Sequence, residues 1–249
     1  MAIRALVFDL WGTLIEDVRE HGNTRRGEVR VRLLLEALAV AGRPVPEEDV
    51  RDAFPPFIAK HGVMQGEGRD LAIAEKVAWF LDDLEPGLAA SLPRQHLDRV
   101  EEAFVSPGRL DPPPPTPGAR EALQEARSRG LRTGLVSNTG FTPGYVLREL
   151  LVEHGLREHL EVLTFSDEAR LAKPAPEIFA CTLDALGVAP DEAVFIGDMP
   201  VLDVQGPRKI GMWTVQVGAR ATDGIEPHAR IDTLHGLFAS LAALGLLED

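Results

Sequence analysis

Short apolar runs alternate with helical patterns along the chain from about residue 117 onward. The runs at residues 131–136, 162–165, 193–196 and 213–217 are each bounded by Gly, Pro or polar residues. Such runs are typical of strands that are buried on both faces of a parallel sheet. A further run at residues 3–8 lies far upstream and is expected to join the same sheet. The pattern therefore predicts an α/β fold.

A different pattern occupies residues 16–110. Apolar residues recur there at spacings of three and four, as at Val29 and Leu33 and again at Ile73 and Val77, which favours amphipathic helices. The proline-rich segment 111–118 cannot form a helix or a central strand, so it predicts a stiff, extended linker and a hinge. A helix is expected from Pro117 to Gly130. We predict a core domain of residues 1–15 and 111–249, with residues 16–110 inserted as a small helical domain.

Composition narrows the functional classes. The 249 residues are 45% hydrophobic without any apolar run near the roughly 20 residues that span a bilayer, so we expect a soluble protein with no membrane partner. The N-terminus leads directly into the first strand, which favours a cytoplasmic location. A formal net charge of −13 argues against nucleic-acid binding but not against a small anionic substrate. The single cysteine, Cys181, is interpreted as a small core residue.

The candidate catalytic and ligand-binding residues follow the ends of the predicted strands. Asp9 follows the first strand and enters a turn at Gly12, so it is placed for chemistry rather than for burial. The segment Ser137-Asn138-Thr139-Gly140 follows the second strand and leads to a helix near Pro143. Such a loop can bind an anion, although a helix cap is an equally good interpretation.

Charged residues follow the later strands. Lys173 precedes two prolines that set the start of a helix, although most lysines are simply solvated. Asp198 and Asp203 follow the strand at 193–196, where Asp198 could also be a helix cap. Together with Asp9 they would repel one another at one sheet edge unless a divalent cation and a lysine shared the site. Oxygen ligands of this kind favour Mg²⁺.

Other polar and aromatic residues receive no functional role from the sequence. The arginines near the start of the helical insert are interpreted as a solvated face, and the first three histidines of the chain do not have the spacing of metal ligands. The aromatic pair in the second helical pattern is interpreted as core. Residues 234–247 predict an apolar helix that covers the sheet or contributes to a dimer face, so the protein is expected to be a monomer or a homodimer. The arginines named above are Arg25, Arg26, Arg30 and Arg32, the histidines are His21, His61 and His96, and the aromatic pair is Trp79 and Phe80.

In order and spacing, four segments resemble the signatures of the haloacid dehalogenase-like (HAD) hydrolase superfamily: Asp9 to Thr13, Ser137-Asn138, Lys173-Pro174, and Gly197-Asp198 with Asp203. The resemblance covers essentially the whole chain. The insert directly after the first segment is similar to the C1-type helical cap of subfamily I. The resemblance implies a Rossmann-like core with a mobile helical lid.

The same resemblance implies roles for individual residues. Asp9 would attack the substrate and form a covalent aspartyl intermediate. Ser137 would bind a phosphoryl oxygen, and Lys173 would neutralise charge on that group and on Asp9. Mg²⁺ would be held by Asp9, Asp198 and the backbone carbonyl of Trp11, with Asp203 supporting the metal site from behind. The remaining substrate-binding residues would be Asn138, Gly12 and Thr13.

Trp11 departs from this pattern. Most phosphatases of the superfamily have an aspartate there that protonates the leaving alcohol, whereas its dehalogenases have a tyrosine. The first interpretation is a Mg²⁺-dependent phosphatase acting on a small phosphate ester, which the retained Gly197-Asp198 favours. The second is a 2-haloacid dehalogenase-type hydrolase that works through an aspartyl ester. The third is a catalytically weak metal- or ligand-binding regulatory protein in which Trp11 plugs the site.

Overall fold

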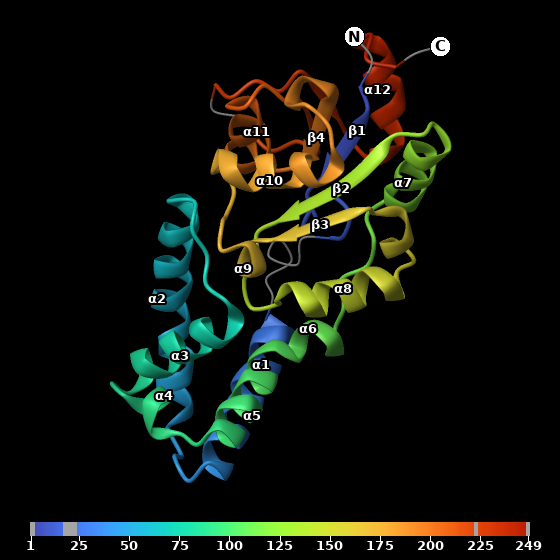
Figure 1. Ribbon diagram of the computed structural model, residues 1–249. Helices are drawn as coiled ribbons and strands as arrows, with labels where there is room; N and C mark the ends of the chain where they lie inside the picture. Colours follow the sequence, from blue (N-terminus) through green and yellow to red (C-terminus); the bar gives the residue numbers. More distant parts are fainter. Residues whose placement is uncertain (1–2, 17–23, 222–223, 248–249) are drawn as a thin grey trace.

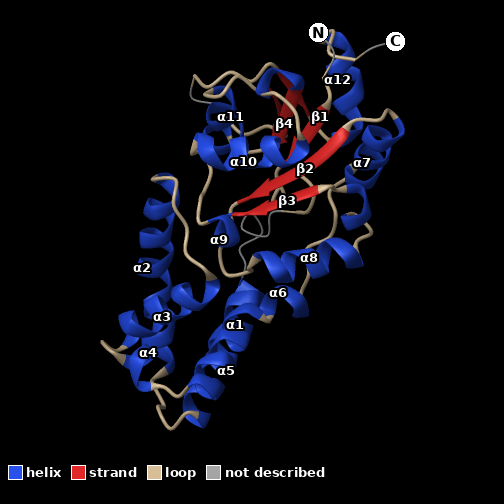
Figure 2. Cartoon of the chain, viewed as in Figure 1, coloured by secondary structure: helices blue, strands red, loops and turns tan. Residues whose placement is uncertain are grey.

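The computed structural model describes residues 3–16, 24–221 and 224–247, and its centre is one parallel sheet (Figures 1 and 2). The spatial order of the strands is β3-β2-β1-β4-β5-β6, and every neighbouring pair is parallel. The sheet and its Rossmann-like architecture confirm the predicted α/β fold. Only β6 was not predicted. The strands are β1 (Ala5–Phe8), β2 (Arg132–Ser137), β3 (Val162–Phe165), β4 (Ala193–Gly197), β5 (Trp213–Val217) and β6 (Ala229–Ile231).

Helices cover both faces of the sheet, because alternate side chains of each strand point to opposite faces. Ala5 and Val7 of β1 pack into a cluster with α10 (Pro176–Leu186). Leu6 and Phe8 pack on the other face in a second cluster. The helices of that second face are α7 (Ala119–Ser128), α8 (Gly144–Glu153) and α12 (Leu237–Ala243). Both faces of β1 are therefore buried, as its continuous apolar run predicts.

Residues 24–110, between β1 and α7, are largely helical, as predicted, and lie to one side of the sheet (Figure 1). We call residues 24–110 the cap segment. Its aromatic core includes Phe80, which is fully buried, with Trp79 half-buried against it, so the interpretation of this pair as core is confirmed. Phe141 and Val146, which follow β2, belong to the same cluster. Its helices are α1 (Thr24–Val40), α2 (Glu47–Gly66), α3 (Ile73–Leu84), α4 (Leu88–Ser91), α5 (Arg94–Val105) and α6 (Pro107–Leu110).

The proline-rich return segment is extended and pairs with the chain that leaves β1. The backbone N–H of Glu16 donates to the Pro114 carbonyl at 2.9 Å, and that of Thr116 donates to the Leu14 carbonyl at 3.0 Å. The next helix, α7, begins at Ala119, two residues later than predicted. The reason is that Gly118 has a φ of 85°, a left-handed conformation that is outside the helical region.

Shorter elements complete the fold. They are α9 (Ser166–Ala169), α11 (Gly206–Arg208), the 3₁₀ turns Arg157–His159, Pro190–Glu192 and Leu234–Gly236, and the π-helical turn Pro200–Gln205. Among the described residues no helix is long and apolar enough to cross a membrane.

Three interpretations of individual side chains were wrong. Cys181 is exposed, because α10 buries the face that carries Ile178, Thr182 and its neighbours rather than the face of Cys181. Arg26 and Arg30 are buried rather than solvated. Arg30 donates from Nε to a cap carbonyl at 2.8 Å and lies 4.3 Å from the centre of the Phe141 ring. Burial lowers the pKa of Arg30 to about 10, and its positive charge stacks on an aromatic face.

Candidate active site

Three carboxylates meet at the carboxyl ends of β1 and β4. These two strands are neighbours, with Phe8 opposite Ile196, so Asp9 and Asp198 leave the sheet side by side. Asp203 comes from the π-helical turn after β4, and one carboxylate oxygen of each residue lies within 4.8 Å of the others. The strand order reverses between β1 and β4, which is where ligands bind in open α/β sheets.

Lys173 joins this cluster from the loop before α10. Its Nζ donates to Asp9 Oδ1 at 2.5 Å and to Asp203 Oδ1 at 2.7 Å. The other oxygen of Asp203 accepts the backbone N–H of Met199 at 2.9 Å. Both oxygens of Asp203 are therefore engaged by the protein, and this carboxylate orients Lys173.

Asp198 is held differently. Its Oδ2 accepts a hydrogen bond from Arg220 Nε at 2.8 Å, whereas its buried Oδ1 has no partner among the described residues. Gly12 packs directly against it: with a φ of 77°, this residue would place a Cβ 2.7 Å from Asp198 Oδ2. A glycine is thus needed at position 12 both for its backbone conformation and for the space that the carboxylate occupies.

Burial strongly perturbs the acids. It raises the pKa of Asp9 to about 7, with Lys173 opposing the rise and the Asp203 and Asp198 carboxylates adding to it. Burial and Asp203 likewise raise the pKa of Asp198 to about 6, against the charge of Arg220. Burial alone would lower the pKa of Lys173, but the carboxylates of Asp203 and Asp9 outweigh it and raise that pKa. The site therefore holds more negative charge than the lysine compensates.

The predicted substrate-binding residues lie at the same edge of the sheet as Asp9. Ser137 is fully buried at the end of β2, and Thr13 donates to Asp9 Oδ2 at 3.4 Å. The Asn138 side chain binds the backbone of Lys173: its Nδ2 donates to the Lys173 carbonyl at 3.0 Å, and its Oδ1 accepts the Lys173 N–H at 2.8 Å. The structure thus brings the Ser137 loop and Lys173 together, while the substrate-binding role of Asn138 remains a prediction.

Two expectations about exposure are corrected here. Asp9 is only 5% exposed and Lys173 2% exposed, although Asp9 was expected to avoid burial and a solvated lysine was the ordinary expectation. The physical reason is that each neutralises part of the other's charge at a direct contact. Trp11 is half-buried and packs against the hydrophobic cluster on the α7 side of the sheet.

Sequence comparison agrees with this geometry. Residues 3–211 match the sequence profile of the haloacid dehalogenase-like hydrolases. The chain belongs to this family. The match runs from β1 past the Asp198 turn and so includes every residue of the carboxylate cluster. The fold and the order of the four segments within this HAD hydrolase confirm the resemblance that the sequence suggests.

The relatives of this HAD hydrolase include proteins named as phosphatases, and solved structures of similar fold include a dehalogenase. A phosphoserine phosphatase from Thermus thermophilus is 40% identical over 129 residues, which are 51% of each chain, so the match spans about half the length of that relative. A glyceraldehyde 3-phosphate phosphatase from Methanopyrus kandleri is 27% identical over 229 residues, 90% of this chain and 88% of the relative. The crystal structure of a 2-haloacid dehalogenase from Pseudomonas syringae has a TM-score of 0.65 at 18% identity, covering 97% of this chain and 99% of its own. That likeness concerns the fold alone.

Sequence reasoning missed several polar residues that the fold brings close to the site. Arg220 was not singled out, although its place just after β5 at the same sheet edge was a usable signal. Asp70 and Lys76 of the cap segment were also missed, and His61 was given no role. These three form a buried cluster with residues after β2 and β3, which no local sequence pattern indicates.

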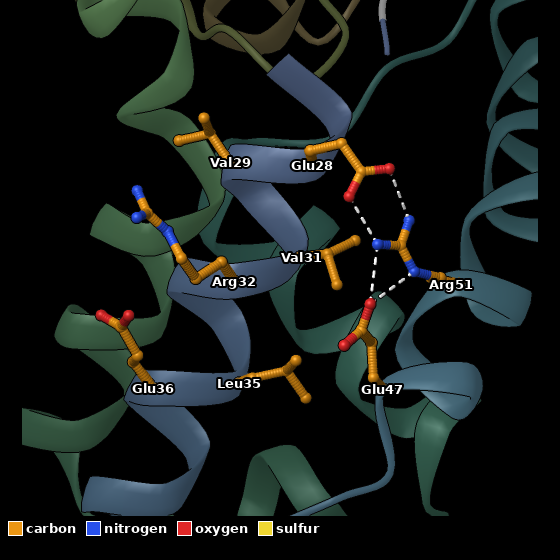
Figure 3. A pocket seen from close by; sticks show the side chains of 8 residues that line it. All are labelled: Glu28, Val29, Val31, Arg32, Leu35, Glu36, Glu47 and Arg51. Carbon is orange, nitrogen blue, oxygen red and sulfur yellow. Dashed lines mark hydrogen bonds and ion pairs between the residues drawn. The ribbon is translucent and has the colours of Figure 1, made fainter. Parts of the chain in front are cut away.

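A surface hollow lies between α1 and α2, away from this chemistry (Figure 3). Arg51 lies on its rim and is paired with Glu28 and with Glu47, the latter at 2.8 Å. All the lining residues belong to α1 and α2, and none is part of the carboxylate cluster. Arg51 already pairs with Glu28 and Glu47 within the cap segment, so we assign the hollow no ligand.

Proposed function

We propose that this HAD hydrolase is a Mg²⁺-dependent phosphatase that acts on a small phosphate ester through an aspartyl-phosphate intermediate on Asp9. The observation that supports this most strongly is the buried cluster of Asp9, Asp198 and Asp203 around one lysine. Three carboxylates at this spacing leave an excess of negative charge, and a phosphate ester would add more. A divalent cation removes both difficulties.

The donor set fits Mg²⁺. Carboxylate oxygens are the ligands this ion prefers, and the buried Oδ1 of Asp198 lacks any other partner among the described residues. Asp9, Asp198 and the Trp11 carbonyl would hold the ion. Asp203 would support it indirectly, since both of its oxygens already bind Lys173 and the Met199 N–H. When bound, the ion supplies positive charge to the phosphoryl oxygens and to the nucleophile.

Asp9, Lys173 and Ser137 each have a different role in the proposed reaction. A carboxylate oxygen of Asp9 attacks phosphorus, the bond from phosphorus to the ester oxygen breaks, and the leaving group departs as its oxyanion and takes a proton from water. Lys173, which already contacts Asp9, neutralises charge on the transferring group, and the Ser137 hydroxyl donates to one of its oxygens. Water then attacks the phosphorus of the aspartyl phosphate, which releases inorganic phosphate and restores the Asp9 carboxylate.

Trp11 determines which esters are suitable. An indole cannot protonate the leaving oxygen, and loss of such acid help typically costs about 10² to 10⁴-fold in rate. We therefore propose that esters with good leaving groups are hydrolysed fastest. Trp11 also motivates the second candidate, a dehalogenase, because a halide leaves without a proton. Against it, Asp9 has a pKa of about 7 without a cation, so a metal-free nucleophile is only about half ionised at neutral pH.

The cap segment would act as the lid of this site, with residues 111–118 as its hinge. The domain division into residues 1–15 with 111–249 and residues 16–110 belongs to this proposal. A cytoplasmic location and a monomeric or homodimeric state accompany it as predictions from the sequence.

The experiment measures phosphate release from p-nitrophenyl phosphate by metal-stripped protein, with and without added Mg²⁺. Asp9→Asn is the blank, because an amide is not a nucleophile for this step. We expect release that requires both Mg²⁺ and Asp9. Equal release by the Asn variant would refute the covalent role of Asp9. No release by the wild type would reject the phosphatase, and halide release from short 2-haloacids would then separate a dehalogenase from a regulatory protein.

A further inference from the structure

A second buried charge cluster surrounds Asp70, whose side chain has no exposed surface. It accepts hydrogen bonds from Ser166 Oγ at 2.5 Å and from Lys76 Nζ at 3.2 Å, and its other oxygen lies 2.7 Å from His61 Nε2. Lys76 is also buried, and its Nζ donates to the carbonyl and hydroxyl oxygens of Thr139 at 3.0 and 3.1 Å. None of these groups takes part in the proposed reaction.

Stability alone is a poor explanation for the burial of the ion pair of Asp70 and Lys76. Removing two charges from water costs about as much as their attraction returns, so apolar residues would serve a purely structural core equally well. The hydrogen bond from His61 and the charge of Lys76 outweigh burial and hold the pKa of Asp70 well below its ordinary value. The Asp70 carboxylate is therefore charged at neutral pH, and its partners require one particular arrangement of the surrounding chain.

The cluster crosses the boundary between the cap segment and the rest of the chain. Asp70 and Lys76 come from the cap segment, whereas Thr139 follows β2 and Ser166 follows β3. The two hydroxyl residues are themselves connected, since the Thr139 N–H donates to Ser166 Oγ at 2.7 Å. Gln65 of the cap segment adds a further bond, from its Nε2 to the Thr139 carbonyl at 2.8 Å. Separation of the cap segment would break the bonds that Asp70, Lys76 and Gln65 form with Ser166 and Thr139.

Backbone pairing extends the same contact. The N–H of Ala172 donates to the Gly68 carbonyl at 3.0 Å, and Arg69 forms an antiparallel bridge with Leu171. Gly68 has a φ of 82°, and a Cβ there would lie 2.6 Å from that of Ala175. The loop between α2 and α3 thus lies against the chain immediately before Lys173, at a distance that only glycine permits.

Both contacted segments carry proposed active-site residues. Thr139 lies two positions after Ser137, and Ala172 lies directly before Lys173. Asn138 connects the two segments through its paired hydrogen bonds with the Lys173 backbone. A displacement at Thr139 would therefore change the positions of Ser137 and Lys173 together.

We propose that Asp70 is a positioning residue: with Lys76 it locks the cap segment onto Thr139 and Ser166 and so holds Ser137 and Lys173 in register for catalysis. The kinetic part of this inference rests on the proposed phosphatase activity. The structural part does not. The lock also opposes opening of the lid, because opening exposes a buried acid and a buried ammonium at the same time.

The test begins with hydrogen–deuterium exchange of metal-stripped protein, which needs no substrate. Asp70→Asn places an amide N–H₂ among hydrogen-bond donors, so we expect amides at residues 137–141 and 170–173 to exchange at least about tenfold faster. Arg51→Gln is the matched control, because it breaks an ion-pair network whose partners lie within the cap segment (Figure 3). Wild-type exchange at both segments in Asp70→Asn would overturn the proposal.

Kinetics then separate positioning from mere folding. With p-nitrophenyl phosphate we expect kcat of Asp70→Asn to fall at least about tenfold, with a smaller change in KM, because misplacement affects the transition state most. The double variant Asp70→Asn/Lys76→Met removes both charges and should recover thermal stability but not kcat, since Thr139 and Ser166 still lack their partners. Recovery of kcat together with stability would show that the cluster is only structural.

A second variant and a comparison with the phosphatase assay allow the two proposals to be tested separately. If Asp70→Asn does not fold, Ser166→Ala carries the test: it keeps the charge pair but removes the hydroxyl that bonds both Asp70 and the Thr139 N–H. Faster exchange at residues 137–141 in that variant supports the proposal, and wild-type exchange there refutes it. If the wild type releases no phosphate while the exchange pattern is as expected, the phosphatase proposal fails and the lock stands.

Discussion

Replacing Asp9 with asparagine removes one charge from a buried cluster of three carboxylates and one ammonium. Burial raises the Asp9 pKa from 3.8 to about 7, so the folded protein binds this proton more tightly than the unfolded chain does. Stability of the metal-free protein must then fall as pH rises from about 4 to about 7. Below this window Asp9 is protonated in both states, and above it the full cost of ionising the buried group is present.

The magnitude follows from the same values. A tenfold change in an ionisation constant corresponds to about 1.4 kcal/mol, so the buried Asp9 anion destabilises the metal-free fold by about 4 kcal/mol above pH 7. Asparagine has no proton to lose. Between pH 5 and pH 8 the stability of Asp9→Asn should therefore rise relative to wild type by about 2 to 3 kcal/mol. Comparing the two pH values cancels any packing difference that does not depend on pH.

The assay is urea unfolding in the presence of EDTA at pH 5 and pH 8. Asp52→Asn provides the matched control, since it removes an exposed carboxylate of α2 that lies outside the cluster. Added Mg²⁺ should stabilise the wild type at pH 8 more than Asp9→Asn, because the ion binds the folded state only. If wild type and Asp9→Asn respond to pH in parallel, the argument that Asp9 lies in an over-charged site is wrong.

Three other substitutions test the metal site and the leaving group. Arg220→Gln should tighten Mn²⁺ binding severalfold, measured by electron paramagnetic resonance, because it frees Asp198 Oδ2; weaker binding would show that Arg220 supports the site. Gly12→Ala should weaken Mn²⁺ binding at least about tenfold and lower the unfolding free energy by about 1 to 2 kcal/mol, because its Cβ would displace Asp198; wild-type affinity would contradict this packing argument. Trp11→Asp should raise turnover of an alkyl phosphate at least about tenfold more than that of p-nitrophenyl phosphate, whereas an equal or lower ratio would indicate that the indole shapes the pocket.

Local pattern predicted the strands well for a physical reason. In a parallel sheet with helices on both faces, each strand is apolar along its whole length, so the run itself is visible. The missed strand, β6, has only three residues, and its middle residue, Arg230, is exposed. It pairs with β5 at the sheet edge, where burial no longer demands an apolar run.

Side-chain burial was predicted less well. Cys181 was assigned to the core from its residue type, but the orientation of α10 against β2 decides which of its faces is buried. Arg26 and Arg30 were assigned to solvent from their charge. Their burial depends on partners far along the chain, such as the carbonyls of Asp111 and Phe104.

By itself, the sequence determined the parallel sheet, the helical insert and the delivery of Asp9, Ser137 and Asp198 to one sheet edge. It could do so because these features depend on local apolar periodicity and on where each strand ends. Only the tertiary structure decided that both oxygens of Asp203 are engaged by the protein, that Arg220 contacts Asp198, and that Asp70 contacts residues after β2 and β3. These contacts join residues between 4 and 96 positions apart, and their geometry is set by how whole segments pack, which no local pattern records.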